Sequence, residues 1–176
     1  KIERSIENKE FSSLPGLMRF ANAIKTANGN AHLCGILSDG GVHSHVDHMI
    51  ETAKILENLG LKVILHLFGD GRDVAPKSIQ TYLEHLNSSI GINTTIGSLT
   101  GRYYSLDRDN RWERVAQGYN SIIHGKGAHH ENANDAILAA YSENLTDEFI
   151  PSSVIGDFKG IKDGDGLLCM NYRADR

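Results

Sequence analysis

The order of apolar and polar positions predicts alternating helices and strands along most of the chain. Apolar residues at helical spacing predict a helix that begins after Pro15 and ends near Asn28-Gly29. The continuous apolar run of residues 32–37 follows, and such a run is typical of a strand that is buried on both faces. The other predicted elements are helices over residues 44–59, 79–90, 112–123 and 133–141, and strands over residues 61–68, 92–99 and 167–171.

This alternation predicts an α/β fold with a mostly parallel central sheet flanked by helices on both faces. We expect a single domain over residues 1–176, because this length suits one ordinary domain and no repeat interrupts the pattern. Ligands of such sheets bind beyond the carboxyl ends of the strands. The polar clusters of this chain all follow predicted strands, so we expect a binding site at that edge.

Composition and charge narrow the class of protein. A hydrophobic fraction of 40% with 23% charged residues is typical of a folded, soluble chain. The formal net charge of -4 gives no general attraction to nucleic acid or to an anionic membrane, and no apolar stretch reaches the ~20 residues of a membrane helix. Cys34 and Cys169 lie in apolar runs, where we interpret them as reduced core residues. We therefore expect a cytoplasmic protein whose partners are small molecules.

Arginines are concentrated in segments that follow predicted strands. Seven of the nine fall in three short segments without lysine, namely Arg72, Arg102, Arg108, Arg111, Arg114, Arg173 and Arg176. A guanidinium matches carboxylate or phosphate with two hydrogen bonds, while lysine offers a point charge. The pattern predicts an oxyanion site, although Arg111 and Arg114 also suit ordinary surface ion pairs beside a helix.

A histidine cluster supports a rival interpretation. His43, His45, Asp47 and His48 fit the H-x-H-x-D-H pattern of zinc-dependent hydrolases of the metallo-β-lactamase kind. If the helix begins at Ser44, however, His45 and His48 lie on its first turn and suit ordinary surface positions. The arginine segments favour the oxyanion site, because a hydrolytic zinc site does not require three arginine loops.

Three carboxylates lie close to the arginine segments in sequence. These are Asp39, Asp70 and Asp73, and a carboxylate beside arginines can accept or return a substrate proton. Asp73 is the best candidate for this catalytic role, with capping of the helix near Pro76 as the alternative. Asp39 precedes Gly40-Gly41 and suits a turn.

Several blocks of the sequence resemble the cofactor-independent phosphoglycerate mutases, in the order in which that family has them. The blocks are HLCGILSDGGVHSH at residues 32–45, GRD at 71–73, GRYYSLDRDNRW at 101–112, DEF at 147–149 and NYRADR at 171–176. The resemblance implies an isomerase of glycolysis and gluconeogenesis that interconverts 3-phosphoglycerate and 2-phosphoglycerate without 2,3-bisphosphoglycerate.

The resemblance also implies two domains with different tasks. A phosphatase-like domain of the same chain is expected to hold two manganese ions and the serine that carries the phosphoryl group. This chain resembles the other domain, the substrate-binding or phosphotransferase domain, which holds and reorients glycerate. Since the chain lacks an initiator Met and stops at Arg176, we expect an excised domain that is inactive alone and holds no metal or cofactor.

Carried over by motif, the family's substrate-binding positions are His43, Arg72, Asp73, Arg102, Arg108, Arg173 and Arg176. Asp73 remains the expected catalytic residue. Gly69 stands where the family usually has leucine before Asp-Gly-Arg-Asp, a departure that removes no charged contact. The alternatives are the zinc-dependent hydrolase and a non-catalytic module that binds anions.

Overall fold

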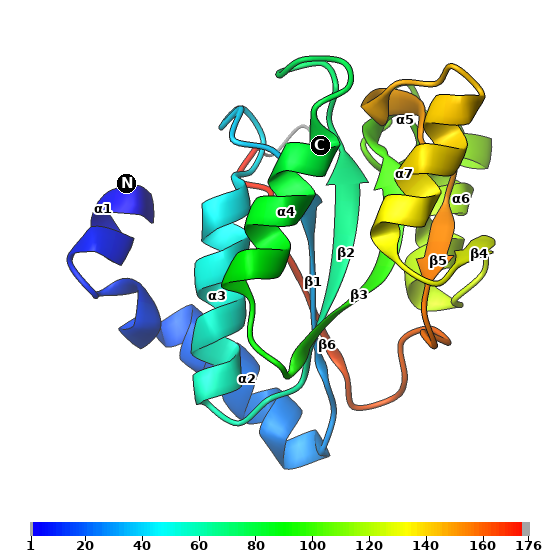
Figure 1. The fold of residues 1–176 in the computed structure, drawn as a ribbon. Coiled ribbons are helices and arrows are strands. Elements are labelled where there is room, and N and C mark those ends of the chain that lie inside the picture. Colours follow the sequence, from blue (N-terminus) through cyan, green and yellow to red (C-terminus); the bar gives the residue numbers. More distant parts are fainter. Residues whose placement is uncertain (1, 174–176) are drawn as a thin grey trace.

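A single sheet forms the centre of the computed structural model, which describes residues 2–173 (Figure 1). Among these residues the strand order is β4-β5-β3-β2-β1-β6. The strands are β1 (Ala31–Ile36), β2 (Val63–Gly69), β3 (Thr94–Gly101), β4 (Ala128–His130), β5 (Ser153–Ile155) and β6 (Gly166–Cys169).

The sheet is mostly parallel, as the alternating pattern predicts. β1 pairs in parallel with both β2 and β6, and β2 pairs in parallel with β3. β5 runs antiparallel to β3 and pairs with it only at Ser98 and Leu99, while β4 pairs in parallel with β5. β4 and β5 have three residues each, too few to carry a recognisable hydrophobic period, so the sequence did not predict them.

All five predicted helices are present. The helices are α1 (Ile2–Glu7), α2 (Pro15–Ala27), α3 (Val46–Asn58), α4 (Ile79–Ser89), α5 (Arg102–Ser105), α6 (Trp112–Ile123) and α7 (Ala133–Ser142), with 3₁₀ turns η1 (Phe11–Ser13) and η2 (Asp147–Phe149). α3 begins later than the expected Ser44, because the Ser44 hydroxyl accepts the backbone N–H of Ile36 at 2.9 Å. His45 caps the helix instead, its Nδ1 accepting the N–H of Asp47 at 3.2 Å.

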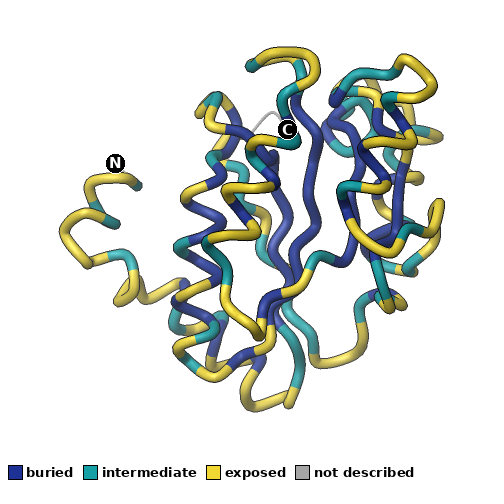
Figure 2. The backbone as a smooth tube through the Cα atoms, in the orientation of Figure 1, coloured by how far each residue is buried: buried dark blue, intermediate teal, exposed yellow. Residues whose placement is uncertain are grey.

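Helices cover the two faces of the sheet unequally. The larger core contains Leu33 and Leu65 from the strands and packs against α2, α3, α4 and α7. The smaller core contains Cys34, Ile36 and Phe68 and packs against Ile122 of α6. β1 and β2 are buried along their whole length, and Figure 2 shows them between exposed outer helix surfaces. The prediction of strands buried on both faces is confirmed.

A row of buried polar side chains crosses the sheet on the face that carries the smaller core. His32 Nε2 lies 3.0 Å from Asp165 Oδ2, and His32 Nδ1 lies 2.9 Å from His66 Nε2. His66 Nδ1 lies 2.8 Å from the Ser98 hydroxyl. Because the Asp165 carboxylate accepts a hydrogen bond from His32 Nε2–H, each imidazole can be neutral, with one nitrogen donating and the other accepting, and the row ends at the Ser98 hydroxyl.

The two cysteines lie side by side but differ in exposure. Cys34 of β1 and Cys169 of β6 are register partners, and Cys34 is buried while Cys169 is exposed. The prediction that both are core residues was wrong for Cys169, because β6 is an edge strand whose alternate side chains face solvent. A hydrogen bond from the Cys34 thiol lowers the pKa of Cys169 to about 6. Within residues 2–173, no helix has the length and apolar character needed to cross a membrane.

Candidate functional site

The carboxyl ends of three neighbouring strands bring the candidate residues together. Ser38 follows β1, Asp70 follows β2 and Arg102 follows β3, so their loops meet at one edge of the sheet, the upper edge in Figure 1. This is the edge where parallel sheets bind ligands.

Arg102 is the buried centre of the cluster, with 4% of its side chain exposed. Its Nη1 donates to Asp70 Oδ1 at 2.7 Å and to Asp73 Oδ2 at 2.6 Å. Its Nη2 lies 2.9 Å from His43 Nε2. A guanidinium has only donors, so His43 must accept here, which leaves the imidazole neutral with its proton on Nδ1. The structure thus brings three predicted residues, His43, Asp73 and Arg102, into direct contact.

Asp70 is the buried carboxylate that connects this cluster to the loops around it. It is 2% exposed, and its Oδ2 accepts the Ser38 hydroxyl at 2.6 Å. Its Oδ1 accepts the backbone N–H groups of Asp73 at 3.0 Å and Arg72 at 3.3 Å, besides the Arg102 guanidinium. Burial alone would raise the pKa of Asp70, but these hydrogen bonds together lower it below the ordinary value. Asp70 is therefore a buried carboxylate that stays charged.

Arg72 and Arg108 are the exposed cations of the site. They line a hollow of about 130 Å³ together with Arg102, Arg114 and Glu148. The Arg72 side chain is 61% exposed, and its Nη1 donates to Glu148 Oε1 at 3.3 Å. Arg72 can exchange the Glu148 carboxylate for a ligand anion.

The C-terminal segment approaches the same edge. The backbone N–H of Tyr172 donates to the carbonyl of His43 at 2.9 Å, and the tyrosine hydroxyl donates to the carbonyl of Gly41. Arg173 therefore follows a residue that is fastened to the β1–α3 loop. Arg176, the last predicted arginine, lies outside the described residues.

Sequence reasoning undervalued several residues around this site. Arg114 is not an ordinary surface residue: its guanidinium lies over the Tyr103 ring at 4.0 Å from the centroid and contacts Asp107, whose side chain is 2% exposed, at 3.4 Å. Glu148 lies in the DEF block, whose sequence does not indicate that it pairs with Arg72. The approach of these residues depends on tertiary structure, and no local pattern indicates it.

The 3₁₀ turn η2 supports the site loops through close backbone contacts. A Cβ at Gly69 would lie 2.3 Å from the carbonyl oxygen of Asp147, and one at Gly101 would lie 2.2 Å from that of Glu148. Side chains at either position would displace η2. The two glycines thus allow η2 to lie directly against the ends of β2 and β3.

The residues of the zinc hypothesis contact one another in pairs, with His45 Nδ1 3.8 Å from Asp47 Oδ2 and the His45 and His48 ring centroids 5.2 Å apart. His43 is engaged by Arg102, and Asp47 Oδ1 lies 2.7 Å from His85 Nε2. His48 is buried against other rings, with the Tyr172 ring 6.2 Å away between centroids. Over residues 2–173, no group of three or more His, Cys, Asp or Glu side chains is arranged to hold a metal ion. The geometry does not support a zinc-dependent hydrolase.

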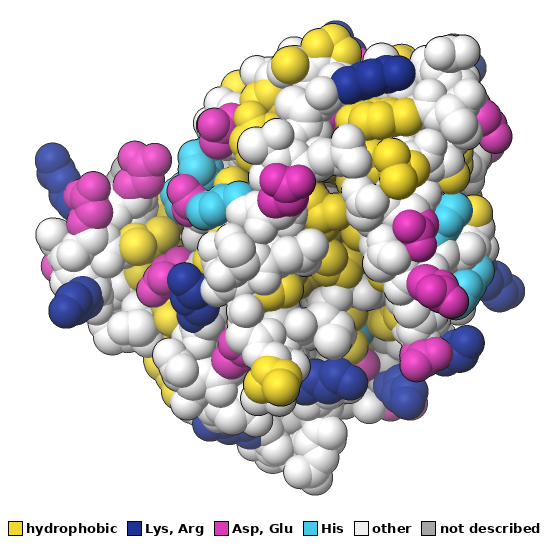
Figure 3. All heavy atoms as spheres, in the orientation of Figure 1, with side chains coloured by type: hydrophobic (Ala, Val, Ile, Leu, Met, Phe, Trp, Pro, Cys, Tyr) yellow, Lys and Arg dark blue, Asp and Glu magenta, His cyan; other side chains and the backbone are white. Residues whose placement is uncertain are grey.

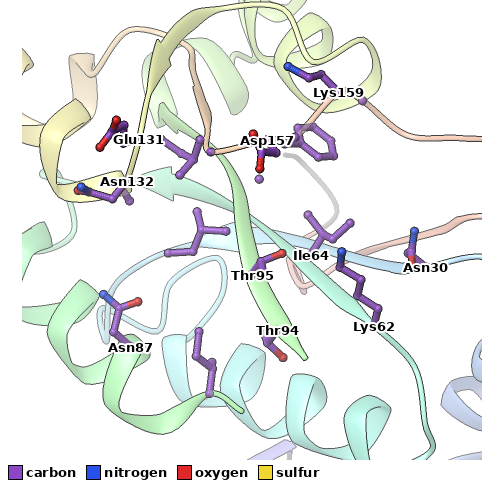
Figure 4. A pocket seen from close by; sticks show the side chains of 18 of the residues that line it. Asn30, Lys62, Ile64, Asn87, Thr94, Thr95, Glu131, Asn132, Asp157 and Lys159 are labelled. Carbon is purple, nitrogen blue, oxygen red and sulfur yellow. The ribbon is translucent and has the colours of Figure 1, made fainter. Parts of the chain in front are cut away.

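A second, larger hollow lies at the opposite end of the sheet. It has a volume of about 700 Å³ and an apolar floor between α4 and α7, visible in Figure 3. Figure 4 shows Lys62, Lys159 and Asn30 on one side and Glu131 and Asn132 on the other. Positively and negatively charged side chains both line the hollow. It opens beside the first residues of β3, which β5 does not reach because it pairs with β3 only at Ser98 and Leu99. None of the predicted site residues up to Arg173 lines this hollow.

Comparison with known proteins places these residues in a family. Residues 2–176 match the family model described as the N-terminus of BPG-independent phosphoglycerate mutases (BPG-independent PGAM N-terminus). The chain belongs to this family. It is 46% identical over its whole length to the 2,3-bisphosphoglycerate-independent phosphoglycerate mutase of Dinoroseobacter shibae and 44% identical to that of Agrobacterium fabrum.

The family assignment extends to the fold. A crystal structure of phosphoglycerate mutase from Leishmania mexicana, determined at low cobalt concentration, superposes on 99% of the chain with a TM-score of 0.88 and 28% identity. The chain spans 35% of the length of the Leishmania protein in that structure. It also spans 35% of the length of each of the two bacterial relatives.

Proposed function

We propose that this chain is the substrate-binding domain of a two-domain phosphoglycerate mutase that interconverts 3-phosphoglycerate and 2-phosphoglycerate. The observation that carries the proposal is the Arg102 cluster. It joins motif residues from three separate loops at the sheet edge where parallel sheets bind ligands, in a chain of this family.

The arrangement supports different tasks for the exposed and the buried cations. Arg72 and Arg108 offer exposed guanidinium groups to the carboxylate and phosphate of the substrate. Asp73 is 20% exposed at its side chain and is held by Arg102, so it can exchange a proton with a substrate hydroxyl without changing position. We assign substrate binding to His43, Arg72, Asp73, Arg102, Arg108, Arg173 and Arg176, and proton transfer to Asp73.

Phosphoryl transfer needs a nucleophile and stabilisation of the transferring group. We place both in a second, phosphatase-like domain of the same longer protein, with a serine and two manganese ions, in a cytoplasmic enzyme. The residues of this chain would bind and orient the glycerate. The names of the relatives support independence from 2,3-bisphosphoglycerate.

The test has two arms. The 176-residue chain is titrated with 3-phosphoglycerate by calorimetry, and the full-length protein is assayed for mutase activity with manganese. We expect the chain to bind 3-phosphoglycerate without turnover and the full-length protein to turn it over. In the full-length Asp73→Asn variant, mutase activity should fall by at least about 100-fold, because the group that carries the proton is removed. Turnover by the chain alone would contradict the division of tasks. An inactive wild-type full-length protein would leave the anion-binding module as the better description.

A further inference from the structure

Arg102 has few donors left for a substrate. A guanidinium carries five N–H donors, and three of those of Arg102 are directed at Asp70, Asp73 and His43. Its position is therefore set by protein groups before any ligand arrives. The arrangement of the site depends on what fixes this guanidinium.

Asp70 is the residue that joins the three loops. It is anchored to the β1 loop through the hydroxyl of Ser38, which is 1% exposed, and to the β3 loop through Arg102. Asp70 also accepts the backbone N–H of Asp73, and this hydrogen bond fixes the loop segment that carries the Asp73 carboxylate. Each of these partners is buried or half-buried, so solvent offers no ready replacement.

We infer that Asp70, anchored by Ser38, is a positioning residue that orients Arg102 and Asp73 for the reaction without touching the substrate. This inference rests on the proposed function. Asp70 is too buried to reach a ligand itself, and its contribution is to keep the two groups that face the ligand at fixed positions.

Three variants separate this role from a general loss of structure. Asp70→Asn keeps the shape and one carbonyl acceptor but removes the charge. Ser38→Ala removes only the anchoring hydroxyl. Asp39→Asn is the matched control, because Asp39 is an exposed carboxylate next to Ser38 whose known partner is the Tyr82 hydroxyl, 2.5 Å away.

The first measurement needs no substrate. In ¹⁵N NMR spectra of the chain, we expect separate signals for the Nη protons of Arg102, because its contacts hinder rotation of the guanidinium. They are assigned by their loss in Arg102→Lys. The signals should coalesce in Asp70→Asn, broaden in Ser38→Ala and remain unchanged in Asp39→Asn. Unchanged signals in Asp70→Asn would overturn the inference. If that variant does not fold, unchanged signals in Ser38→Ala would do so.

The second measurement uses mutase kinetics of the full-length protein. A displacement of about 1 Å can cost up to ~100-fold in rate, so we expect Asp70→Asn to lose roughly 10- to 100-fold in kcat, with KM changed by less than about threefold. Ser38→Ala should lose roughly threefold, and Asp39→Asn should stay within about twofold of wild type. Equal losses in Asp39→Asn and Asp70→Asn would overturn the positioning role. A wild-type protein without activity would overturn the proposed function, while the NMR result would still decide what orients Arg102.

Discussion

Individual polar residues of this chain form hydrogen-bonded pairs and rows whose members come from different strands and loops. Arg102 is neutralised by two carboxylates, and removing it would leave the buried Asp70 carboxylate without its cation and take the closest cation from Asp73. Truncation of one partner of a buried pair typically costs about 3–5 kcal/mol. Loss of activity in an Arg102→Ala variant would therefore combine lost stability with lost function, whereas Asp73→Asn changes a more exposed group.

The buried histidine row makes the stability of the chain depend on pH. Burial lowers the pKa of His66 to about 3 and also lowers the pKa of His32, although Asp165 partly opposes this. Below the ordinary histidine pKa of 6.5 the unfolded chain binds protons that the folded chain does not. The free energy of unfolding should therefore fall as pH decreases from about 6.5 towards 4, by up to ~1.4 kcal/mol per pH unit for His66, with His32 acting in the same direction.

Urea unfolding between pH 7.5 and 4 checks this prediction. His66→Asn should reduce the slope by about one histidine equivalent. The same slope in wild type and His66→Asn would show that the row does not control the acid stability.

At the scale of elements, the 3₁₀ turn η2 acts as the cap of a helix that precedes it by more than 60 residues. Asp147 Oδ2 accepts the backbone N–H groups of Ser78 at 2.8 Å and Ile79 at 2.9 Å, at the start of α4. Asp147 Oδ1 accepts the Tyr141 hydroxyl at 2.5 Å, which connects α7 to the same point. Burial raises the pKa of Asp147 above its ordinary value despite these hydrogen bonds.

Asp147→Ala should lower the free energy of unfolding by roughly 2–4 kcal/mol, because it removes a helix cap and leaves a half-buried hydroxyl without its acceptor. Tyr141→Phe, which removes only one of the three hydrogen bonds, should cost about 1 kcal/mol. Equilibrium unfolding in urea measures both. An Asp147→Ala variant as stable as Tyr141→Phe would contradict the capping role.

The cap of α4 is a feature that the sequence alone could not predict, unlike the helices and most strands. Long apolar periods predicted five helices and four parallel strands, because burial against a sheet repeats over many residues. Capping of the helix near Pro76 was the alternative to a catalytic role for Asp73, but the cap of α4 comes from Asp147, a contact between segments that lie far apart in sequence. In the same way, the motifs identified His43, Asp73 and Arg102, whereas the contacts of Asp70 and Glu148 required three loops to be placed together.

At the scale of the whole molecule, stability should be concentrated in one part of the sheet. β1, β2 and β3 are long, mutually paired and covered by the larger core. β4 and β5 are short, and β5 meets β3 at only two residue pairs. α1 has no buried residue.

Hydrogen exchange measured by mass spectrometry should therefore show slow exchange in β1 and β2, intermediate exchange in β4 and β5, and rapid exchange in α1. The difference between β2 and β5 should exceed about tenfold in rate, because local opening of the short strands breaks few contacts. Uniform protection across all strands would indicate that the sheet opens only as one unit.

The close contact between Gly69 and η2 has a consequence for the divergence of this sequence within its family. A side chain at position 69 would overlap the carbonyl of Asp147, so the leucine that the family pattern leads one to expect there requires η2 to lie farther from β2. A single replacement of Gly69 by leucine would move the acceptors of the α4 cap and the carboxylate that faces Arg72 at the same time. Among homologues, a change between glycine and leucine at position 69 should therefore be accompanied by changes in residues 146–149. The two segments should vary together.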